Sequence, residues 1–147
     1  MIRWYFLDTT AAAIRAMEQY DSMQWILKNA QGEITKAEGD MVSISSPGFE
    51  ENRSSGDVRS GENRMVNQME NLDVLRHRYE TALEYDRWFT PAWMELTEEE
   101  RQLLKGLYMD GLTCPDMCEE LKIEKTTLYK RRNRALSHLS TLLYGLM

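Results

Sequence analysis

The stretch from Leu96 to Leu143, LTEEERQLLKGLYMDGLTCPDMCEELKIEKTTLYKRRNRALSHLSTLL, decides the fold. Thr97 and the three glutamates after it form a capping-box start: the hydroxyl accepts a backbone N–H, and Glu100 reaches back to the cap. A helix is therefore expected to begin near Glu98. Its leucines recur at spacings of three and four, which makes one apolar stripe, and Asp110-Gly111 ends it.

Two further helices are expected in the same stretch. Thr113 caps a short second helix, in which Pro115 is tolerated because the first-turn N–H groups have no helical partner. Ile123 fills the next turn, and a third helix opens at Lys125 or Thr126. The expected inward residues are Met117, Cys118 and Leu121 on the second helix and Leu128, Ala135, Leu136, Leu139 and Leu142 on the third. This order of elements predicts a helix-turn-helix.

The third helix is the basic part of an acidic chain. From Lys122 to His138 there are six cations and one anion, a formal charge of +5, whereas the whole chain carries −6. The local field governs contact with nucleic acid, so the overall charge does not argue against DNA. Long cations and amides hydrogen-bond base edges, while lysine and arginine also neutralise phosphates. The candidates are Lys125, Thr126, Tyr129 and Lys130 for base edges, Arg131, Arg132 and Arg134 for phosphates, and Thr113 and Lys122 for anchoring the DNA backbone. The alternative is a solvated basic helix face.

The same stretch resembles the DNA-binding fourth region of bacterial sigma factors. The shared features are the acidic-capped helix, Gly-Leu-Thr before the second helix, Thr-Leu in the third helix and Arg-Ala-Leu near its end. Together with SPGFEENRSSGDVRSGENRMVNQMENLDVLRHRYETALEYDRWF ahead of it, roughly residues 41 to 145 are similar to the ArpU and RinA type of phage-encoded transcriptional regulators of Gram-positive hosts. The resemblance implies activation of late, lysis or packaging genes. The chain departs from the pattern at Lys122, where glycine is usual, and at Cys118, where alanine is usual.

The residues ahead of this stretch predict two long helices joined by a polar loop. The first helix runs from about Ile2 to Gln31, with a bend at residues 20–22, and the second from about Glu62 to Phe89. The loop, 39–61, is expected to lack regular structure apart from a short strand at 41–44, and Thr90-Pro91 is expected to break the second helix, with 91–94 as the connection. The expected inward residues are Trp4, Leu7, Ala11, Ile14, Met17, Asp21 or Met23, Trp25 and Lys28 on the first helix, and Met65, Met69, Leu72, Leu75, Tyr79, Leu83 and Trp88 on the second.

The predicted fold is therefore all-α. Residues 1–95 form a helical region for packing or oligomerisation, and residues 96–147 form the helix-turn-helix domain. No phosphate-binding glycine loop, nucleophile with a base, or catalytic-metal spacing occurs, so we expect neither an enzyme nor a cofactor. Cys114 and Cys118 are only four residues apart, so a disulfide between them would not link distant parts of the chain. Together with His138 they provide three potential zinc ligands, whereas a structural zinc site needs four. The chain has no eighteen-residue apolar span and no signal-peptide pattern at its start, so we expect a cytoplasmic protein without a membrane partner.

Three functions remain open at this point. The first is a DNA-binding regulator working beside the host RNA polymerase. It would be a homodimer through the amino-terminal helix, since paired half-sites raise affinity for double-stranded DNA. The second is a packaging adaptor of the small-terminase type, which couples a helix-turn-helix to helical oligomerisation. The third is a sigma-like module that binds RNA polymerase without touching DNA.

Overall fold

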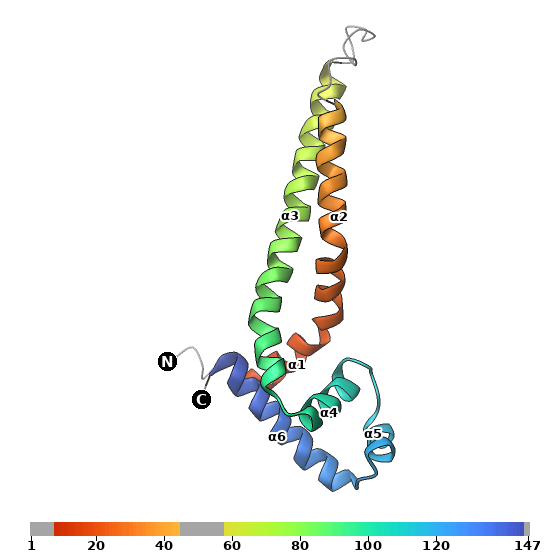
Figure 1. Cartoon of the computed structure of the whole chain (residues 1–147), viewed down its shortest axis with the longest axis vertical. Helices are drawn as coiled ribbons and strands as arrows, with labels where there is room; N and C mark the ends of the chain where they lie inside the picture. Colours follow the sequence, from red (N-terminus) through yellow and green to blue (C-terminus); the bar gives the residue numbers. More distant parts are fainter. Residues whose placement is uncertain (1–7, 45–57, 146–147) are drawn as a thin grey trace. The chain divides into compact units, whose positions relative to one another are not determined.

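The computed structural model describes residues 8–44 and 58–145, and every regular element in these two ranges is a helix. In chain order the helices are α1 (Thr9–Glu18), α2 (Tyr20–Ile44), α3 (Val58–Glu95), α4 (Glu98–Tyr108), α5 (Cys114–Leu121) and α6 (Lys125–Tyr144) (Figure 1). The predicted all-α fold with two long helices in the amino-terminal half is confirmed. None of the helices in the described ranges is both long and apolar enough to cross a membrane.

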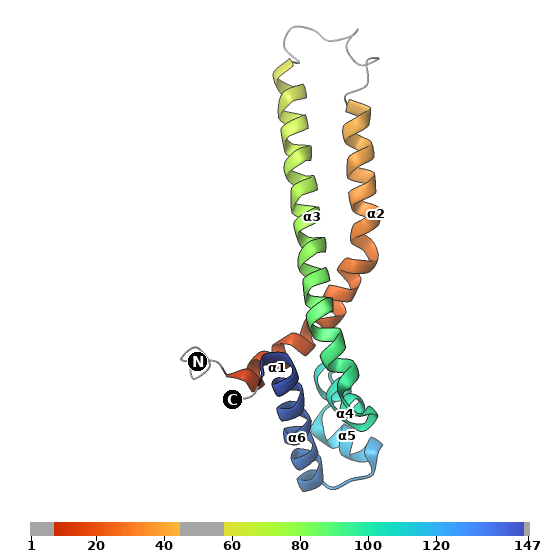
Figure 2. The same cartoon turned by 60° about the vertical axis from the view of Figure 1, so that its left-hand side comes forward.

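Contacts divide the chain into two compact units, which are described separately. The first unit contains residues 1–23 and 85–147, and the second contains residues 24–84. We call the second unit the hairpin, because the α2 and α3 segments within it run antiparallel (Figure 2). Residues 1–23 and 85–95, expected in the amino-terminal region, lie in the same unit as α4, α5 and α6.

The amino-terminal helix is interrupted at Gln19, next to the predicted bend. Asp8 caps α1, its carboxylate accepting the N–H of Ala11 at 3.0 Å. The N–H of Gln19 bonds to the Arg15 carbonyl, and α2 resumes at once with Tyr20. The predicted start of this helix, residues 2–7, lies outside the described residues.

The predicted loop at 39–61 is wrong at both of its ends. Helix α2 continues through residues 39–44, so the short strand predicted at 41–44 is wrong as well, and α3 already begins at Val58. Gly39 weakens a helix by only about 1 kcal/mol. Met41 lies seven residues, or two helical turns, after the buried Ile34, and it lines a groove together with Met69 and Leu72 of α3. The apolar stripe of α2 therefore extends past Gly39, and so does the helix. Residues 45–57 lie outside the described residues.

The predicted break at Thr90-Pro91 is also wrong, because α3 continues through Pro91 to Glu95. The Thr90 hydroxyl donates to an Asp86 carboxylate oxygen at 2.8 Å within the same helix. Pro91 is near the end of the helix and removes one backbone hydrogen bond. Its neighbours Phe89 and Ala92 are both buried, and this packing outweighs the proline. Only Leu96 and Thr97 are left to join α3 to α4.

The core of the first unit joins α1, the end of α3, α4 and α6. It consists of Ala13, Ala16, Met17, Tyr85, Phe89, Ala92, Leu96, Leu104, Ala135, Leu136, Leu139 and Leu143. The Tyr85 hydroxyl donates to the Ala16 carbonyl, and burial raises the pKa of this phenol. Phe89 stacks between Tyr85 and Trp93, with ring centroids 5.2 and 5.7 Å apart. Residues far apart in sequence therefore fix the position of α6.

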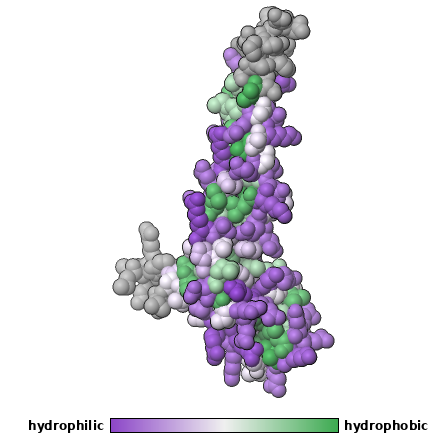
Figure 3. Space-filling model, in the orientation of Figure 1, coloured by the Kyte–Doolittle hydropathy of each residue, from purple (hydrophilic) through white to green (hydrophobic). Residues whose placement is uncertain are grey.

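The hairpin has a much smaller core. Its buried hydrophobic residues in the described range are Ala30, Ile34, Leu72 and Ala82. Arg76 donates to Glu38 at 2.9 Å across the two helices. Trp25, predicted to face inward, is 55 % exposed, and Met69 is 50 % exposed. Figure 3 shows hydrophobic patches among hydrophilic side chains along this unit. The helical spacing of apolar residues thus identifies a helix but does not determine how deeply each of these residues is buried.

Candidate nucleic-acid interface

Two locally capped helices precede α6. Thr97 accepts the Glu100 N–H at 3.2 Å, and Glu100 accepts the Thr97 N–H at 3.1 Å, which confirms the predicted capping box and the start of α4 at Glu98. Thr113 forms a second capping box with Asp116, at 3.3 and 3.1 Å. Hydrogen bonds from Thr113 lower the pKa of Asp116. The ends of both helices are therefore set by neighbouring residues.

The turn between α5 and α6 has a left-handed residue, Lys122, with φ 56° and ψ 48°. This is the position where the sigma-like pattern usually has glycine, and a residue with a Cβ costs about 1 kcal/mol there. The next N–H, from Ile123, bonds to the Cys118 carbonyl at 3.1 Å and closes the turn. Ile123 packs against the cluster described next, as its predicted place in the turn requires.

A second small core holds α5 between α4 and α6. Leu103, Met117 and Leu128 are buried in it, with Cys118 and Leu121 half-buried against them. Gly106 of α4 is also buried, and a Cβ at this position would overlap the Met117 side chain. The close approach of α4 and α5 therefore leaves no room for a Cβ at residue 106 unless the end of the Met117 side chain shifts, a constraint that the sequence alone did not reveal.

The inward face of α6 is nearly as predicted. Leu128, Ala135, Leu136 and Leu139 are buried. The exception is the last turn, where Leu142 is 38 % exposed and Leu143 is buried in its place. Leu143, four residues after Leu139, lies closer to the same helix face than Leu142, three residues after it. In this turn the Trp88 indole N–H donates to the Leu143 carbonyl at 3.2 Å, and the Trp88 ring packs on Tyr144.

The rest of α6 is cationic. The helix has five cations and no acidic residue between Lys125 and Tyr144. Four of the cations, Lys125, Lys130, Arg131 and Arg134, are exposed, as is Thr126, whereas Tyr129 and Arg132 are half-buried. Helical spacing separates these side chains into three rows along the helix. The middle row contains Thr126 and Lys130, one flank contains Lys125, Tyr129 and Arg132, and the other flank contains Arg131, Arg134 and His138.

The first flank is a stack around Tyr129. The Lys125 ammonium lies 5.6 Å and the Arg132 guanidinium carbon 4.8 Å from the centre of the Tyr129 ring. Arg132 also donates to the Asn133 side chain at 3.3 Å, and its buried Nε has no hydrogen-bond partner. Arg132, expected at a phosphate, is therefore held against the protein surface and orients Tyr129.

The other flank borders a groove of about 650 Å³ between α4 and α6. Leu103, Leu121 and Ala135 contribute apolar surface, and Arg131, Arg134 and Glu99 lie among its charged residues. Both residues expected to anchor the DNA backbone, Thr113 and Lys122, are exposed outside this groove, at the two ends of α5. The Thr113 hydroxyl accepts the Asp116 N–H and belongs to the cap of α5.

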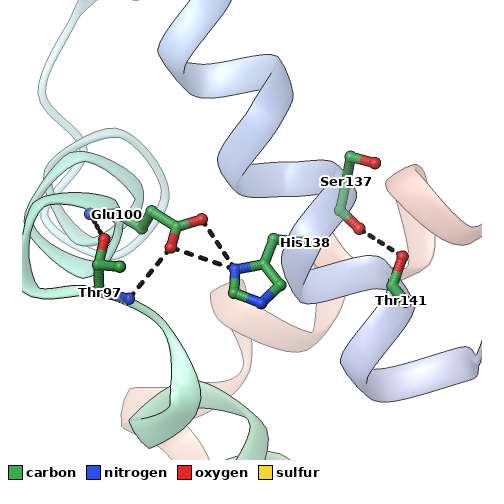
Figure 4. Close-up of polar contacts among 5 residues, drawn as sticks. All are labelled: Thr97, Glu100, Ser137, His138 and Thr141. Carbon is green, nitrogen blue, oxygen red and sulfur yellow. Dashed lines mark hydrogen bonds and ion pairs between the residues drawn. The ribbon is translucent and has the colours of Figure 1, made fainter.

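Glu100 and His138 form a contact in this groove that the sequence did not indicate, because 38 residues separate them. The His138 Nδ1 lies 3.1 and 3.0 Å from the two Glu100 carboxylate oxygens, and one of these also accepts the Thr97 N–H (Figure 4). Burial raises the pKa of Glu100, but hydrogen bonds from Thr97 and His138 outweigh it and bring the pKa below its usual value. The start of α4 is thereby tied to the second half of α6.

The structure also locates the two cysteines and the potential metal ligands. Cys114 and Cys118 are both free and half-buried. No three His, Cys, Asp or Glu side chains of the described residues come together in a way that could hold a metal ion.

Comparisons of the chain with family models, curated proteins and solved structures find no match. The resemblance to sigma region four and to the ArpU and RinA regulators therefore stays a prediction.

Proposed function

We propose that this protein is a sequence-specific transcriptional regulator that places α6 in the major groove of double-stranded DNA. The observation that carries the proposal is the charge of α6, which has five cations, four of them exposed, and no acidic residue. The opposite face of the same helix is buried in two clusters. A rigidly held basic helix after a short helix and a tight turn is the arrangement of a helix-turn-helix.

The three rows of α6 suggest separate roles in this complex. Thr126 and Lys130, in the middle row, reach base edges, while Arg131 and Arg134 neutralise phosphates on one flank. Lys125 and Tyr129 lie on the other flank, where the Arg132 contact restricts the tyrosine ring. Thr113 and Lys122 approach the DNA backbone from the ends of α5.

Selection of DNA fragments from the source genome tests the proposal. Purified protein is compared at about 150 mM salt with a Lys125→Glu/Lys130→Glu variant. The matched control is Lys28→Glu/Lys36→Glu, which makes the same charge change at two exposed lysines of α2. A discrete site recovered by parent and control and lost by the α6 variant supports the proposal. Recovery of no specific DNA by the parent contradicts it.

The groove between α4 and α6 favours a second candidate, a protein contact with host RNA polymerase. Its apolar residues lie among charges of both signs, which suits a polar protein partner more than a phosphate. A Glu99→Lys variant separates the two functions, because it removes an exposed groove carboxylate and makes the charge near α6 more positive. Loss of polymerase capture with retained DNA selection assigns the groove to polymerase. Unchanged capture removes this second candidate.

The biological role within this proposal follows from the resemblance. It is activation of phage late genes beside the host polymerase, in the cytoplasm of a bacterial host. Transcription from the selected site in a purified system, with and without the protein, tests the direction of regulation. The small-terminase alternative predicts instead a closed ring of many subunits, which sedimentation would detect.

A further inference from the structure

The face of α3 that points away from α2 in the hairpin has an unusual charge order. We call it the α3 outer face and define it by Asn67, Glu70, Val74, Arg78 and Thr81, all of which are exposed. Leu72, two residues from Val74, is buried in the hairpin, so the outer face lies on the other side of the helix. Val74 is 57 % exposed on this otherwise polar surface.

Four charges on this side of α3 are self-complementary about Val74. Glu70 and Arg78 lie four residues before and after it, and Arg64 and Glu84 lie ten residues before and after it. When the helix is turned end for end about Val74, each of these two acids falls on one of these two bases. At 1.5 Å per residue, the two sets lie about 6 Å and about 15 Å from the centre, within reach of long side chains in a nearly antiparallel helix pair.

These four charges have no ion-pair partner among the described residues. Arg76, by contrast, is paired with Glu38 across the hairpin. Glu80 and Glu84 even lie four residues apart on α3, a like-charge spacing that destabilises an isolated helix. The charge pattern of the outer face therefore has no evident use within one copy of the described chain.

The hairpin also needs more burial than it contains. Its core of Ala30, Ile34, Leu72 and Ala82 is small for two long helices, and helix stability in water comes mostly from packing. A shallow groove of about 530 Å³ beside the outer face, lined by Asn63, Arg64, Asn67, Gln68 and Asn71, offers amide groups for further contacts. A second helix laid along this face would cover Val74 and meet these amides.

We propose that the α3 outer face binds the same face of a second copy of this chain, antiparallel, about a two-fold axis at Val74. Each Glu70 pairs with the second copy's Arg78, and each Arg64 pairs with the second copy's Glu84. The two valines meet at the axis. The contact is isologous, so every pair occurs twice. This inference places the self-association on α3, and it does not rest on the proposed function because it concerns the hairpin without DNA.

A charge swap tests the proposed dimer in the full-length chain. Sedimentation without DNA compares the parent with Glu70→Arg, Arg78→Glu and the double variant Glu70→Arg/Arg78→Glu. Each single change creates two like-charge pairs and is expected to weaken dimerisation about tenfold or more, whereas the double variant restores it. Lys28→Glu/Glu33→Lys, a swap at two exposed α2 residues, is the matched control and leaves the dimer intact.

Every outcome of this experiment bears on the proposal. A monomeric parent at micromolar concentration overturns it, as does a dimer that neither single variant weakens. Weakening without rescue by the double variant overturns the antiparallel alignment. A second measurement is independent of charge: Val74→Cys, oxidised and digested, is expected to yield a peptide linked between residue 74 of two copies. Val66→Cys, at another exposed valine of α3, is the control and is expected to give far less of the corresponding product.

Discussion

The first unit and the hairpin are built from the same kind of element and differ in what holds their helices. In the first unit, hydrogen-bonded caps set the ends of α4 and α5, and two buried clusters fix α6. In the described part of the hairpin, the long helices share a few buried residues and an ion pair between exposed side chains. The comparison teaches that helical periodicity alone does not measure tertiary stability.

The largest expected effect concerns the charge of α6 compared with that of the hairpin. If about four phosphates are neutralised, the logarithm of DNA affinity falls with the logarithm of salt concentration at a slope near −4, about 100-fold or more between 50 and 200 mM. Arg131→Ala/Arg134→Ala is expected to reduce the slope to about −2. Lys28→Ala/Lys36→Ala in the hairpin leaves it unchanged. Titrations at several salt concentrations measure this, and a parent slope near zero removes the electrostatic part of the proposed function.

The same substitution at two glycines is expected to act in opposite directions in the two units. Gly106→Ala forces the new methyl group against the buried Met117 side chain and costs about 1 to 3 kcal/mol. Gly32→Ala in α2 meets no atom within 4 Å and stabilises its helix by up to about 1 kcal/mol. Urea unfolding followed by circular dichroism measures both. Destabilisation by Gly32→Ala would instead indicate that a partner packs closely on that face.

The carboxylates of Glu100 and Glu38 allow a partly buried contact to be compared with an exposed one. The folded-state pKa of Glu100 is lower than its unfolded value, so its contribution is complete above pH 4.5 and is lost as pH falls through the folded pKa. Glu100→Gln is expected to lower stability at pH 7 by about 1 kcal/mol and to flatten the loss in acid.

The exposed counterpart is Glu38 in the hairpin, where both partners of the ion pair are about half exposed. Glu38→Gln is expected to change stability by less than about 0.5 kcal/mol. Thermal unfolding of the parent and both variants between about pH 7 and pH 3 checks the comparison. Equal acid profiles for all three proteins would mean that the Glu100 contact contributes nothing.

The smallest expected effect is at the one non-glycine residue of the described chain with a positive φ, Lys122. Lys122→Gly relieves the left-handed backbone but adds freedom to the unfolded chain, so a net gain below about 1 kcal/mol is expected. Lys36→Gly in the helical hairpin has the opposite sign, a loss of about 1 kcal/mol. Chemical unfolding of the two variants measures the pair.

Local chemistry explains which parts of the structure the sequence could predict. Thr97 and Thr113 cap helices through hydrogen bonds with residues three positions away. The starts of α4 and α5 could therefore be predicted from the sequence. Except for Leu142 in the last turn, the inward leucines of α6 followed from their spacing, as did its exposed lysines. Signals of this kind are complete within one or two helical turns.

The errors arose where distant packing outweighed local preference. Pro91 and Gly39 favour a helix end, yet both helices continue through these positions, where buried residues lie near Pro91 and the half-buried Met41 follows Gly39. The Glu100–His138 contact, the lack of room for a Cβ at residue 106 and the attachment of Arg132 to Tyr129 depend on which helices meet, as does the pairing of α1 with α6. No pattern of a single helix contains this information.

The discontinuity of the first unit has a consequence for how the chain folds. α1 reaches its place beside α6 only after residues 24–84 are looped out, and closing a flexible loop of that length costs about 2 kcal/mol more than closing one of five residues. If the hairpin forms first, its two antiparallel helices bring residues 24 and 84 together and remove most of that entropy. A preformed hairpin then lowers the entropic cost of docking α1. Its stability therefore sets the rate at which α1 docks, while the contacts of the docked helix are unchanged.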